Sequence, residues 1–480
     1  MPLALRPKMC MSCFQEYYLG NTKIVKFENA NQTLRAAPQP GTMAYFLSRV
    51  WVQPLLESQY PGQQPRRACP HCGELLPANT ENVDSKVIAI IGASNVGKSH
   101  YTAVLINQLL ATTVLQDVGC KPLFAEAASE RRYFQYYKTP LLGRKEELPN
   151  TRKPTDADGN VLPIKPLIFE LSRRDGETVF GKSIDLVFFD AAGEDMTDEQ
   201  ILALYDKFIP FASGIIFLID PLQLASIRER IPEARRKNIR VNTADLAQPL
   251  SVITHIRDSF QKFRGHHSAI NVPTAFVLSK SDMLTSPNPQ DPADQSSLLS
   301  QHSPVFRQSV HRGGYNLQDG VQVDREVRDL LAQEDAGVTL AAADTFTPHA
   351  FFAVSATGSP PDSTRHFSTI SPLRVVDPLF WVLAQLGFID EIPLPVTTAA
   401  PGAPQGAAYT YARVPTPVAP PVAPPAFHPA PPPMAPGVGA PAQPGYWSPP
   451  AAPPAPAAPN APATHGAPYD PGDPNNQRMR

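Results

Sequence analysis

The chain has 480 residues, with 42 lysines and arginines against 44 aspartates and glutamates, and a formal net charge of -2. This length leaves room for about two to four domains. The near-neutral balance gives no strong signal for a nucleic-acid or anionic-membrane partner. No apolar run approaches the roughly 18 residues of a membrane-spanning helix, and the N-terminus lacks the apolar stretch of a signal peptide. We therefore expect a cytoplasmic protein without a membrane span.

Four of the five cysteines form two C-x-x-C pairs near the N-terminus. Cys10 and Cys13 make one pair, Cys69 and Cys72 the other, and 55 residues separate them. Two such pairs can complete a tetrahedral set of four thiolates around one ion. A redox dithiol and unrelated buried cysteines are the alternatives, and the lack of a thioredoxin-like βαβ pattern disfavours the first. We predict a structural Zn²⁺ site in a zinc-ribbon-like domain over residues 1–85.

Three further features of the chain bear on that prediction. His71 lies inside the second pair and is expected to be exposed rather than a ligand. Residues 43–56 are apolar and favour a helix between the pairs. Cys120, the fifth cysteine, is expected to pack as a small hydrophobic side chain.

A phosphate-binding motif follows the first strong strand pattern. Residues 87–91 are apolar and predict a buried parallel strand, and residues 100–110 carry a helical pattern. Between them lies Gly-x-x-x-x-Gly-Lys-Ser in the strand–loop–helix context that the motif requires. Its glycines let backbone N–H groups point at a phosphate, and the helix dipole adds to that field. The residues expected to bind the nucleotide here are Gly92, Ser94, Asn95, Val96, Gly97, Lys98, Ser99 and His100.

Two of these side chains have particular roles. Lys98 would reach the β- and γ-phosphates and is a candidate catalytic cation, while the Ser99 hydroxyl would ligate Mg²⁺.

Later apolar segments predict further strands of one sheet. Residues 166–171 and 184–189 favour a hairpin. Residues 214–220 and 273–278 are near-continuous apolar runs, as expected of strands covered on both faces, and residues 351–354 follow.

Polar residues follow several of these strands. Asp190 is placed to hold Mg²⁺ through water, and Gly193 can offer its N–H to the γ-phosphate. The Asp282 carboxylate can accept two hydrogen bonds from guanine, whereas adenine offers no such donor pair. Lys280 would lie along the base, and a backbone N–H of Ser355–Ala356 can meet the guanine oxygen.

The order and spacing of these motifs resemble those of GTPases of the translation-factor-related (TRAFAC) class, over residues 86–390. The cysteine pairs, the Phe-Phe-Asp-Ala-Ala-Gly-Glu string and the Leu-Ile-Asp-Pro strand end are similar to bacterial double-GTPase domains of type 2. The resemblance implies GTP or GDP and Mg²⁺ as ligands. It also implies protein partners, including a second GTPase, in a multi-component conflict or signalling system.

This sequence departs from that pattern at two positions. The resemblance makes Ser279–Asp282 the fourth motif of the class, and there Ser279 stands where Asn is usual. Glu194 stands where many small GTPases have the Gln that orients water. We therefore expect slow hydrolysis, with Glu194 as a candidate catalytic residue. The threonine that closes over Mg²⁺ is left open between Thr155, which is slightly preferred as a catalytic candidate, and Thr151, with Thr139 less favoured.

The predicted fold is a doubly wound, mostly parallel α/β P-loop domain over residues 86–390. Insertions at 222–270 and 285–345 interrupt it. Helices are expected over 250–263, 323–334 and 379–386. The last would have Asp377 as its N-cap and Pro378 in its first turn, and its Trp381 would be a core residue.

A basic cluster lies in the first insertion. A solvated helix face is favoured over a docking surface or an arginine supplied to a partner's phosphate site. Its members are Arg228, Arg230, Arg235, Arg236, Lys237 and Arg240.

Residues 391–480 hold 27 of the 56 prolines. Such a segment cannot bury enough apolar surface to offset its ordering entropy, so a disordered Pro/Ala-rich tail is expected. It is interpreted either as a tether or as a carrier of short aromatic anchors. Overall, the sequence favours a GTP-binding switch that hydrolyses GTP slowly. The alternatives are a P-loop ATPase and a nucleotide-bound scaffold whose ribbon and tail recruit partners.

Overall fold

The structure is a computed structural model, and it describes the chain in separate ranges. These are residues 7–26, 33–35, 65–77, 80, 83–93, 95–111, 113–125, 127–149, 166–173, 182–189, 209–236, 239, 249–264, 270–285, 297–334 and 337–392. The chain divides into two units, Met1–Thr416 and Pro417–Arg480, and all described residues belong to the first. Several predictions therefore fall outside the described residues, namely those on Ser94, Thr151, Thr155, Asp190, Gly193, Glu194, Lys237, Arg240, the helix over 43–56 and the tail.

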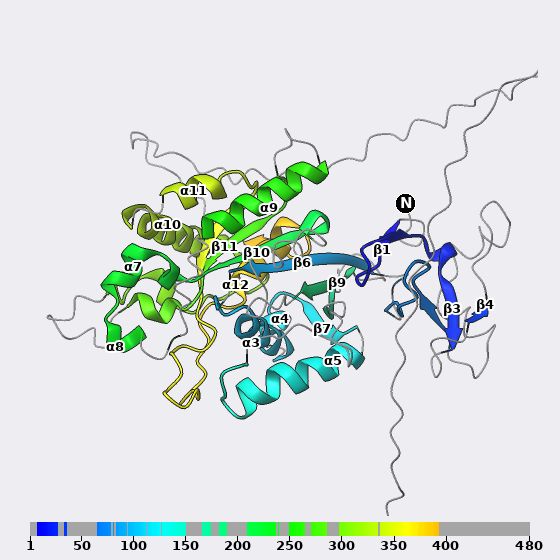
Figure 1. Ribbon diagram of the computed structural model, residues 1–480, viewed down its shortest axis with the longest axis horizontal. Helices are drawn as coiled ribbons and strands as arrows, with labels where there is room; N and C mark the ends of the chain where they lie inside the picture. Colours follow the sequence, from blue (N-terminus) through cyan, green and yellow to red (C-terminus); the bar gives the residue numbers. More distant parts are fainter. Residues whose placement is uncertain are drawn as a thin grey trace, which may run out of the picture. The chain divides into compact units, whose positions relative to one another are not determined.

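A seven-stranded sheet forms the centre of the first unit (Figure 1). Its strand order is β13 (His349–Ala353), β11 (Thr274–Leu278), β10 (Gly214–Ile219), β6 (Asp84–Gly92), β9 (Lys182–Phe189), β8 (Leu167–Arg173) and β7 (Cys120–Phe124). The first five strands are parallel, and β8 and β7 are antiparallel to their neighbours. The predicted α/β fold class, with a mostly parallel sheet, is confirmed, as is the hairpin of β8 and β9.

Helices cover both faces of this sheet (Figure 1). Side chains alternate along β6, so Ile88 and Ile90 join one core cluster while Val87 and Ile91 join the other. The first cluster includes α3 (Lys98–Leu110) and α12 (Asp377–Gln385), and the second includes α7 (Ala225–Arg230), α9 (Pro249–Arg264) and α10 (Leu317–Gln333). Burial on both faces explains why the strand sequences are continuous apolar runs.

Shorter helices complete the domain. They are α4 (Thr113–Gln116), α5 (Ala127–Tyr133), which continues as a π-helix over Phe134–Gly143, α8 (Glu233–Arg236) and α11 (Gly337–Ala343). Thr139 lies within the π-helix. Short 3-10 helices span Ile209–Phe211, Pro221–Gln223, Ser281–Leu284 and Pro304–Phe306. Within the described ranges, no helix combines the length and apolar character needed to cross a membrane.

The edge strand β7 is not predicted by the sequence pattern. It contains Pro122, which cannot donate to a strand ladder and is therefore confined to edge strands, where this one lies. Cys120 begins this strand, is 1% exposed and belongs to the core, as expected of a small hydrophobic side chain.

The closing helix α12 differs from its prediction at one residue. Asp377 is the first helical residue and Val376 is the N-cap, so the prediction of Asp377 as the cap is wrong. The Asp377 carboxylate instead contacts the side chains of His311 and Arg374, both of which are buried. Arg374 offers a charged N–H donor and His311 a ring N–H donor, and the carboxylate binds these groups instead of capping the helix. Trp381 is 1% exposed and packs on Phe352, so its prediction as a core residue is confirmed.

The N-terminal part has short strands. β1 (Lys8–Met9) pairs with β2 (Glu16–Tyr17), and a 3-10 turn spans Leu19–Asn21. β3 (Lys23–Lys26) pairs with both β4 (Thr33–Arg35) and β5 (Pro65–Ala68). The last described strand, β14 (Glu391–Ile392), pairs with β12 (Tyr315–Asn316).

Candidate nucleotide site and cysteine cluster

The described residues of the loop between β6 and α3 include positions that favour glycine or asparagine. A Cβ atom added at Gly92 would lie 2.7 Å from the Leu218 carbonyl oxygen, so only glycine fits this close approach. Gly97 has φ +92° and caps α3. Asn95 also has a positive φ of 61°, in the region that Asn tolerates better than most residues. The Lys98 ammonium donates to the Gly92 and Ala93 carbonyls at 3.1 and 2.8 Å, which holds it over the loop.

The loop after β11 is attached to the end of β10. Ser279 donates to the Ile219 carbonyl from both its N–H, at 2.8 Å, and its hydroxyl, at 3.2 Å. The Lys280 ammonium donates to the Asn95 carbonyl at 3.0 Å and lies 2.5 Å from the Asp220 carboxylate. The fourth motif and the phosphate loop are therefore in direct contact. Lys280 makes the contact with the phosphate loop, whereas the Ser279 hydroxyl, which is shorter than the usual Asn side chain, binds the end of β10.

The Asp282 carboxylate is hydrogen-bonded by Ser355, which lies just after β13. The Ser355 hydroxyl donates to it at 2.6 Å and accepts from the Gly358 N–H at 2.9 Å. Burial raises the pKa of Asp282, and the Ser355 hydrogen bond partly opposes that rise by favouring the charged form. The Ser355 N–H donates to the Leu373 carbonyl at 3.1 Å, so of the Ser355–Ala356 pair the Ser355 N–H is already engaged within the chain.

Arg235 also binds the loop that carries Asp282. Its guanidinium, which is half-buried, donates to the carbonyls of Asp282 and Thr285 at 3.0 and 2.8 Å. Elsewhere in the basic cluster, Arg228 donates to the Leu222 carbonyl, and Arg230 pairs with Glu334. The expectation of a solvated helix face is therefore wrong for Arg235, which binds the loop after β11. Arg230 lies on α7 with 48% of its side chain exposed, in agreement with a solvated face.

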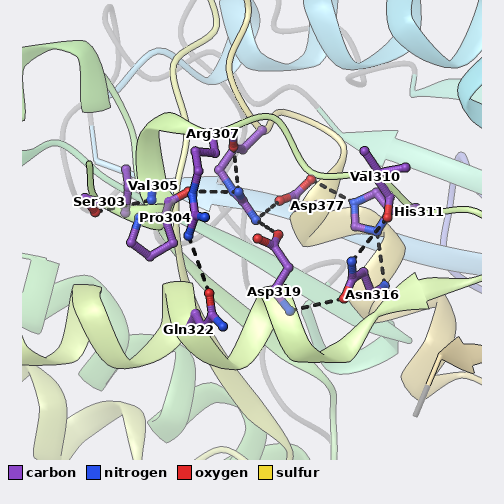
Figure 2. A network of polar contacts seen from close by, with 11 residues as sticks. Ser303, Pro304, Val305, Arg307, Val310, His311, Asn316, Asp319, Gln322 and Asp377 are labelled. Atoms are coloured by element: carbon purple, nitrogen blue, oxygen red, sulfur yellow. Dashed lines mark hydrogen bonds and ion pairs between the residues drawn. The ribbon is translucent and has the colours of Figure 1, made fainter. Parts of the chain in front are cut away.

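The segment that follows Ser355 is anchored by a buried polar network (Figure 2). Leu373 exchanges backbone hydrogen bonds with Ser355 at 3.1 and 2.8 Å. The next residue, Arg374, is 2% exposed. Its guanidinium donates to the Pro304 and Arg307 carbonyls at 3.0 and 2.7 Å and pairs with Asp377 and Asp319. These contacts connect the second insertion to the segment beside Asp282.

His311 completes this network. Its Nδ1 accepts the Asn316 N–H at 3.2 Å, so its Nε2 carries the proton that is donated to Asp377 at 2.9 Å. Figure 2 shows His311 between Asp377 and Asn316.

A pocket joins these loops at the carboxyl ends of the parallel strands, where open α/β sheets bind ligands. It brings together the predicted residues Asn95, Val96, Gly97, His100, Lys280, Asp282, Ser355 and Ala356. Gly92, Lys98 and Ser99 lie in the adjoining loop and the first turn of α3. His100 accepts the Leu148 N–H at 3.2 Å, so it attaches the segment before residue 150 to α3.

Several residues of this region have no predicted role at the nucleotide site. Asp220, Arg235, Ile239 and Phe367 contact or line the site. A signal existed for Asp220, because it is a carboxylate directly after an apolar strand and before a proline. Ile239 and Phe367 have no local signal, and Arg235 stands out in the sequence only as a member of the basic cluster, since only the tertiary fold brings these residues to the pocket or to the loop beside it.

The two cysteine pairs form one cluster, as predicted. Their four sulfur atoms all lie within 4.8 Å of one another. The Cys10–Cys72 and Cys13–Cys69 Sγ distances are 3.7 and 3.8 Å. A tetrahedral ion with metal–sulfur bonds of about 2.3 Å requires sulfur–sulfur separations of roughly 3.8 Å. The cluster therefore fits a tetrahedral metal ion.

The two pairs also share one backbone geometry. The Phe14 N–H donates to the Cys10 carbonyl at 2.9 Å, and the Gly73 N–H donates to the Cys69 carbonyl at 3.0 Å. Phe14 and Gly73 each follow the second cysteine of a pair and have positive φ values of 57° and 77°. The same turn thus aims both thiols of each pair at one point. His71 is exposed, and its ring nitrogen lies 3.0 Å from the Glu16 carbonyl oxygen, which agrees with a non-ligand role.

Comparison with known proteins places this geometry in a family. The family model described as Double-GTPase 2 matches residues 86–331. A candidate ESX-1 scaffolding and assembly protein of Mycolicibacterium smegmatis, SaeC, is 30% identical over 328 residues, which are 67% of this chain and 80% of that protein.

Two solved structures are also similar. A probable GTP-binding protein, EngB, matches 62% of this chain and 99% of its own, with 12% identity and a TM-score of 0.23. The GTPase-like domain of S. cerevisiae Ski7, bound to GTP, matches 57% of this chain and 43% of its own, with 12% identity and a TM-score of 0.24. The family model itself spans the phosphate loop, the sheet from β6 to β11 and the loop after β11 that carries Asp282. This chain belongs to the Double-GTPase 2 family of P-loop GTP-binding proteins.

Proposed function

We propose that this chain binds GTP and GDP with Mg²⁺, hydrolyses GTP slowly and acts as a nucleotide-dependent switch. The observation that carries the proposal is the Asp282 carboxylate, held by Ser355 at 2.6 Å beside a pocket that reaches the phosphate loop. Guanine presents a ring N–H and an amino group that such a carboxylate can accept, whereas adenine presents no such pair.

The proposed roles follow the loops. The phosphate-loop amides and the Lys98 ammonium would bind the phosphates, and Ser99 with Asp190 would hold Mg²⁺, which supplies charge stabilisation at the γ-phosphate. Gly193 would contact the γ-phosphate. Glu194 and a threonine, Thr155 or Thr151, would act on the attacking water and on Mg²⁺.

We further propose that the cysteine cluster holds Zn²⁺ with Cys10, Cys13, Cys69 and Cys72. Four thiolates leave no open coordination position, so the ion would stabilise the N-terminal domain rather than react.

We propose that the chain works with protein partners. The name of the Mycolicibacterium smegmatis relative refers to scaffolding and assembly, and the family name refers to a pair of GTPases. A second GTPase in a multi-component bacterial system is the partner that this supports best. The relative's name also supports a second candidate function, a scaffold in which nucleotide is bound without turnover.

The base specificity tests the nucleotide site. Isothermal titration of the full chain with Mg·GDP, Mg·XDP and Mg·ADP should give tight binding for GDP alone. Asp282→Asn should shift the preference toward XDP, because the amide can donate to the additional carbonyl oxygen of xanthine. The control is Asp324→Asn, a buried carboxylate of α10 outside the pocket. Equal binding of ADP would favour an ATPase, and no binding of any nucleotide would refute the proposal.

Turnover separates the switch from the scaffold. Phosphate release from GTP should be slow in the wild type and absent in Lys98→Ala. If neither protein releases phosphate, and a second GTPase from the same gene neighbourhood is captured equally with GTP and GDP, the scaffold is the better description.

A further inference from the structure

A buried carboxylate, Asp220, lies at the carboxyl end of β10. It is 2% exposed, and one of its oxygens accepts the Leu222 N–H at 2.9 Å. Its other oxygen lies 2.5 Å from the Lys280 ammonium. An ionised carboxylate removed from water is costly unless an opposite charge accompanies it. Asp220 and Lys280 therefore hold each other in place.

The Lys280 ammonium has a second partner in the phosphate loop. It donates to the Asn95 carbonyl at 3.0 Å, across a sequence separation of 185 residues. The residue before it, Ser279, is bound by two hydrogen bonds to the Ile219 carbonyl, immediately before Asp220. Two consecutive residues thus attach this loop to the end of β10. Ser279 does so by hydrogen bonds, and Lys280 by an ion pair.

Asp220 restricts where the Lys280 ammonium lies, which the flexible side chain of the lysine does not do by itself. A lysine ammonium is a point charge on a flexible chain of four carbons and has no fixed donor geometry. With the carbonyl of Asn95 alone as a partner, the ammonium would have one neutral acceptor. The buried carboxylate adds a charged acceptor from the end of β10, so two fixed groups hold the ammonium beside the phosphate loop, next to the loop that carries Asp282.

We propose that Asp220 is a positioning residue of the nucleotide site. Its carboxylate fixes Lys280 between the two loops, so that the base and the phosphates of a guanosine diphosphate are bound as one unit. Asp220 acts through Lys280 and does not itself contact the ligand. This inference rests on the proposed nucleotide-binding function and identifies a residue that sets the affinity of that same site.

The test is a double-variant cycle on the affinity for Mg·GDP, measured by isothermal titration on the full chain. Hydrogen bonds to charged groups contribute enough free energy that Asp220→Asn should weaken binding about 10- to 100-fold. Lys280→Met should weaken it by a similar or larger factor. The double variant should bind within about twofold of Lys280→Met, because Asp220 has nothing left to position.

The matched control is Asp324→Asn. Asp324 is also a buried carboxylate, which accepts the Phe351 N–H and pairs with Arg328, but it does not line the pocket. It should lower the thermal midpoint of unfolding yet leave the dissociation constant within about twofold of the wild type. A purely structural role for Asp220 would give it the same behaviour as this control.

The outcomes are distinct. If the wild type binds GDP but Asp220→Asn binds equally well, or if the effects of the two single variants multiply in the double variant, the inference is wrong while the proposed function stands. If the wild type binds no nucleotide, both are wrong. Should Asp220→Asn not fold, the ¹⁵N spectrum of lysine ammonium groups in the wild type decides. A slowly exchanging ammonium signal that disappears in Lys280→Arg supports the Asp220–Lys280 pair. If the wild type shows no such signal, the inference is wrong.

Discussion

The most direct energetic test concerns the buried Arg374 network. Arg374→Met removes a guanidinium that is 2% exposed and leaves the Asp377 carboxylate, with 3% of its side chain exposed, without its cationic partner. It also leaves two carbonyls, of Pro304 and Arg307, without their donor. Removal of one member of a buried ion pair costs about 3–5 kcal/mol, because the remaining charge stays out of water. We expect a loss of unfolding free energy in that range.

Urea unfolding of the full chain, followed by tryptophan fluorescence and by circular dichroism, measures this loss through the transition midpoint at a constant slope. The matched control is Arg144→Met, which breaks the Arg144–Glu146 pair at 2.8 Å, whose side chains are 56% and 36% exposed. Exposed pairs contribute about 0–1 kcal/mol. Asp319→Asn in the Arg374→Met background should recover part of the loss, because it removes a stranded carboxylate. Equal losses for the two arginine variants, or a loss below about 1 kcal/mol for Arg374→Met, would refute the reasoning.

Three further predictions concern the metal, the phosphate loop and the base. Mass spectrometry of the purified chain should detect stoichiometric zinc that is lost in Cys69→Ser and retained in Cys120→Ser, because Cys120 packs in the core beside the seven-stranded sheet. Gly92→Ala should abolish nucleotide binding and cost about 1–3 kcal/mol, because the new methyl group would lie 2.7 Å from a carbonyl oxygen of β10. The affinity for GDP should fall as the pH is lowered, because protonated Asp282 cannot accept both guanine donors. Since burial raises its pKa, the fall should begin above the pH expected for an exposed aspartate, and Ser355→Ala should move it higher still.

Each of these predictions has a result that contradicts it. Full zinc content in Cys69→Ser with unchanged stability would exclude the four-thiolate site. Gly143→Ala is the control for the glycine, since its added methyl group would meet no atom closer than 4.0 Å. Equal effects of the two glycine variants would remove the steric argument. An affinity that is flat with pH down to the titration of an exposed aspartate would show that the Asp282 carboxylate does not receive the base.

The sequence alone determined the parts of this protein whose signals are local. The phosphate loop, the apolar strands and the carboxylate four positions after β11 depend on spacings of a few residues along one strand, turn or helix. Such spacings can be recognised in the sequence because local backbone geometry requires them. The two C-x-x-C pairs are equally local, and the structure confirms that their sulfur atoms converge.

The tertiary structure alone decided which distant residues support the site. Asp220 meets Lys280 across 60 residues, Arg235 meets the Asp282 carbonyl across 47, and Arg374 meets the Pro304 carbonyl across 70. No periodicity relates such positions, because these contacts arise only where strand ends converge and loops pack. The same reason explains the error at Asp377, since local rules favour an N-cap there while a buried histidine and a buried arginine offer its carboxylate stronger partners.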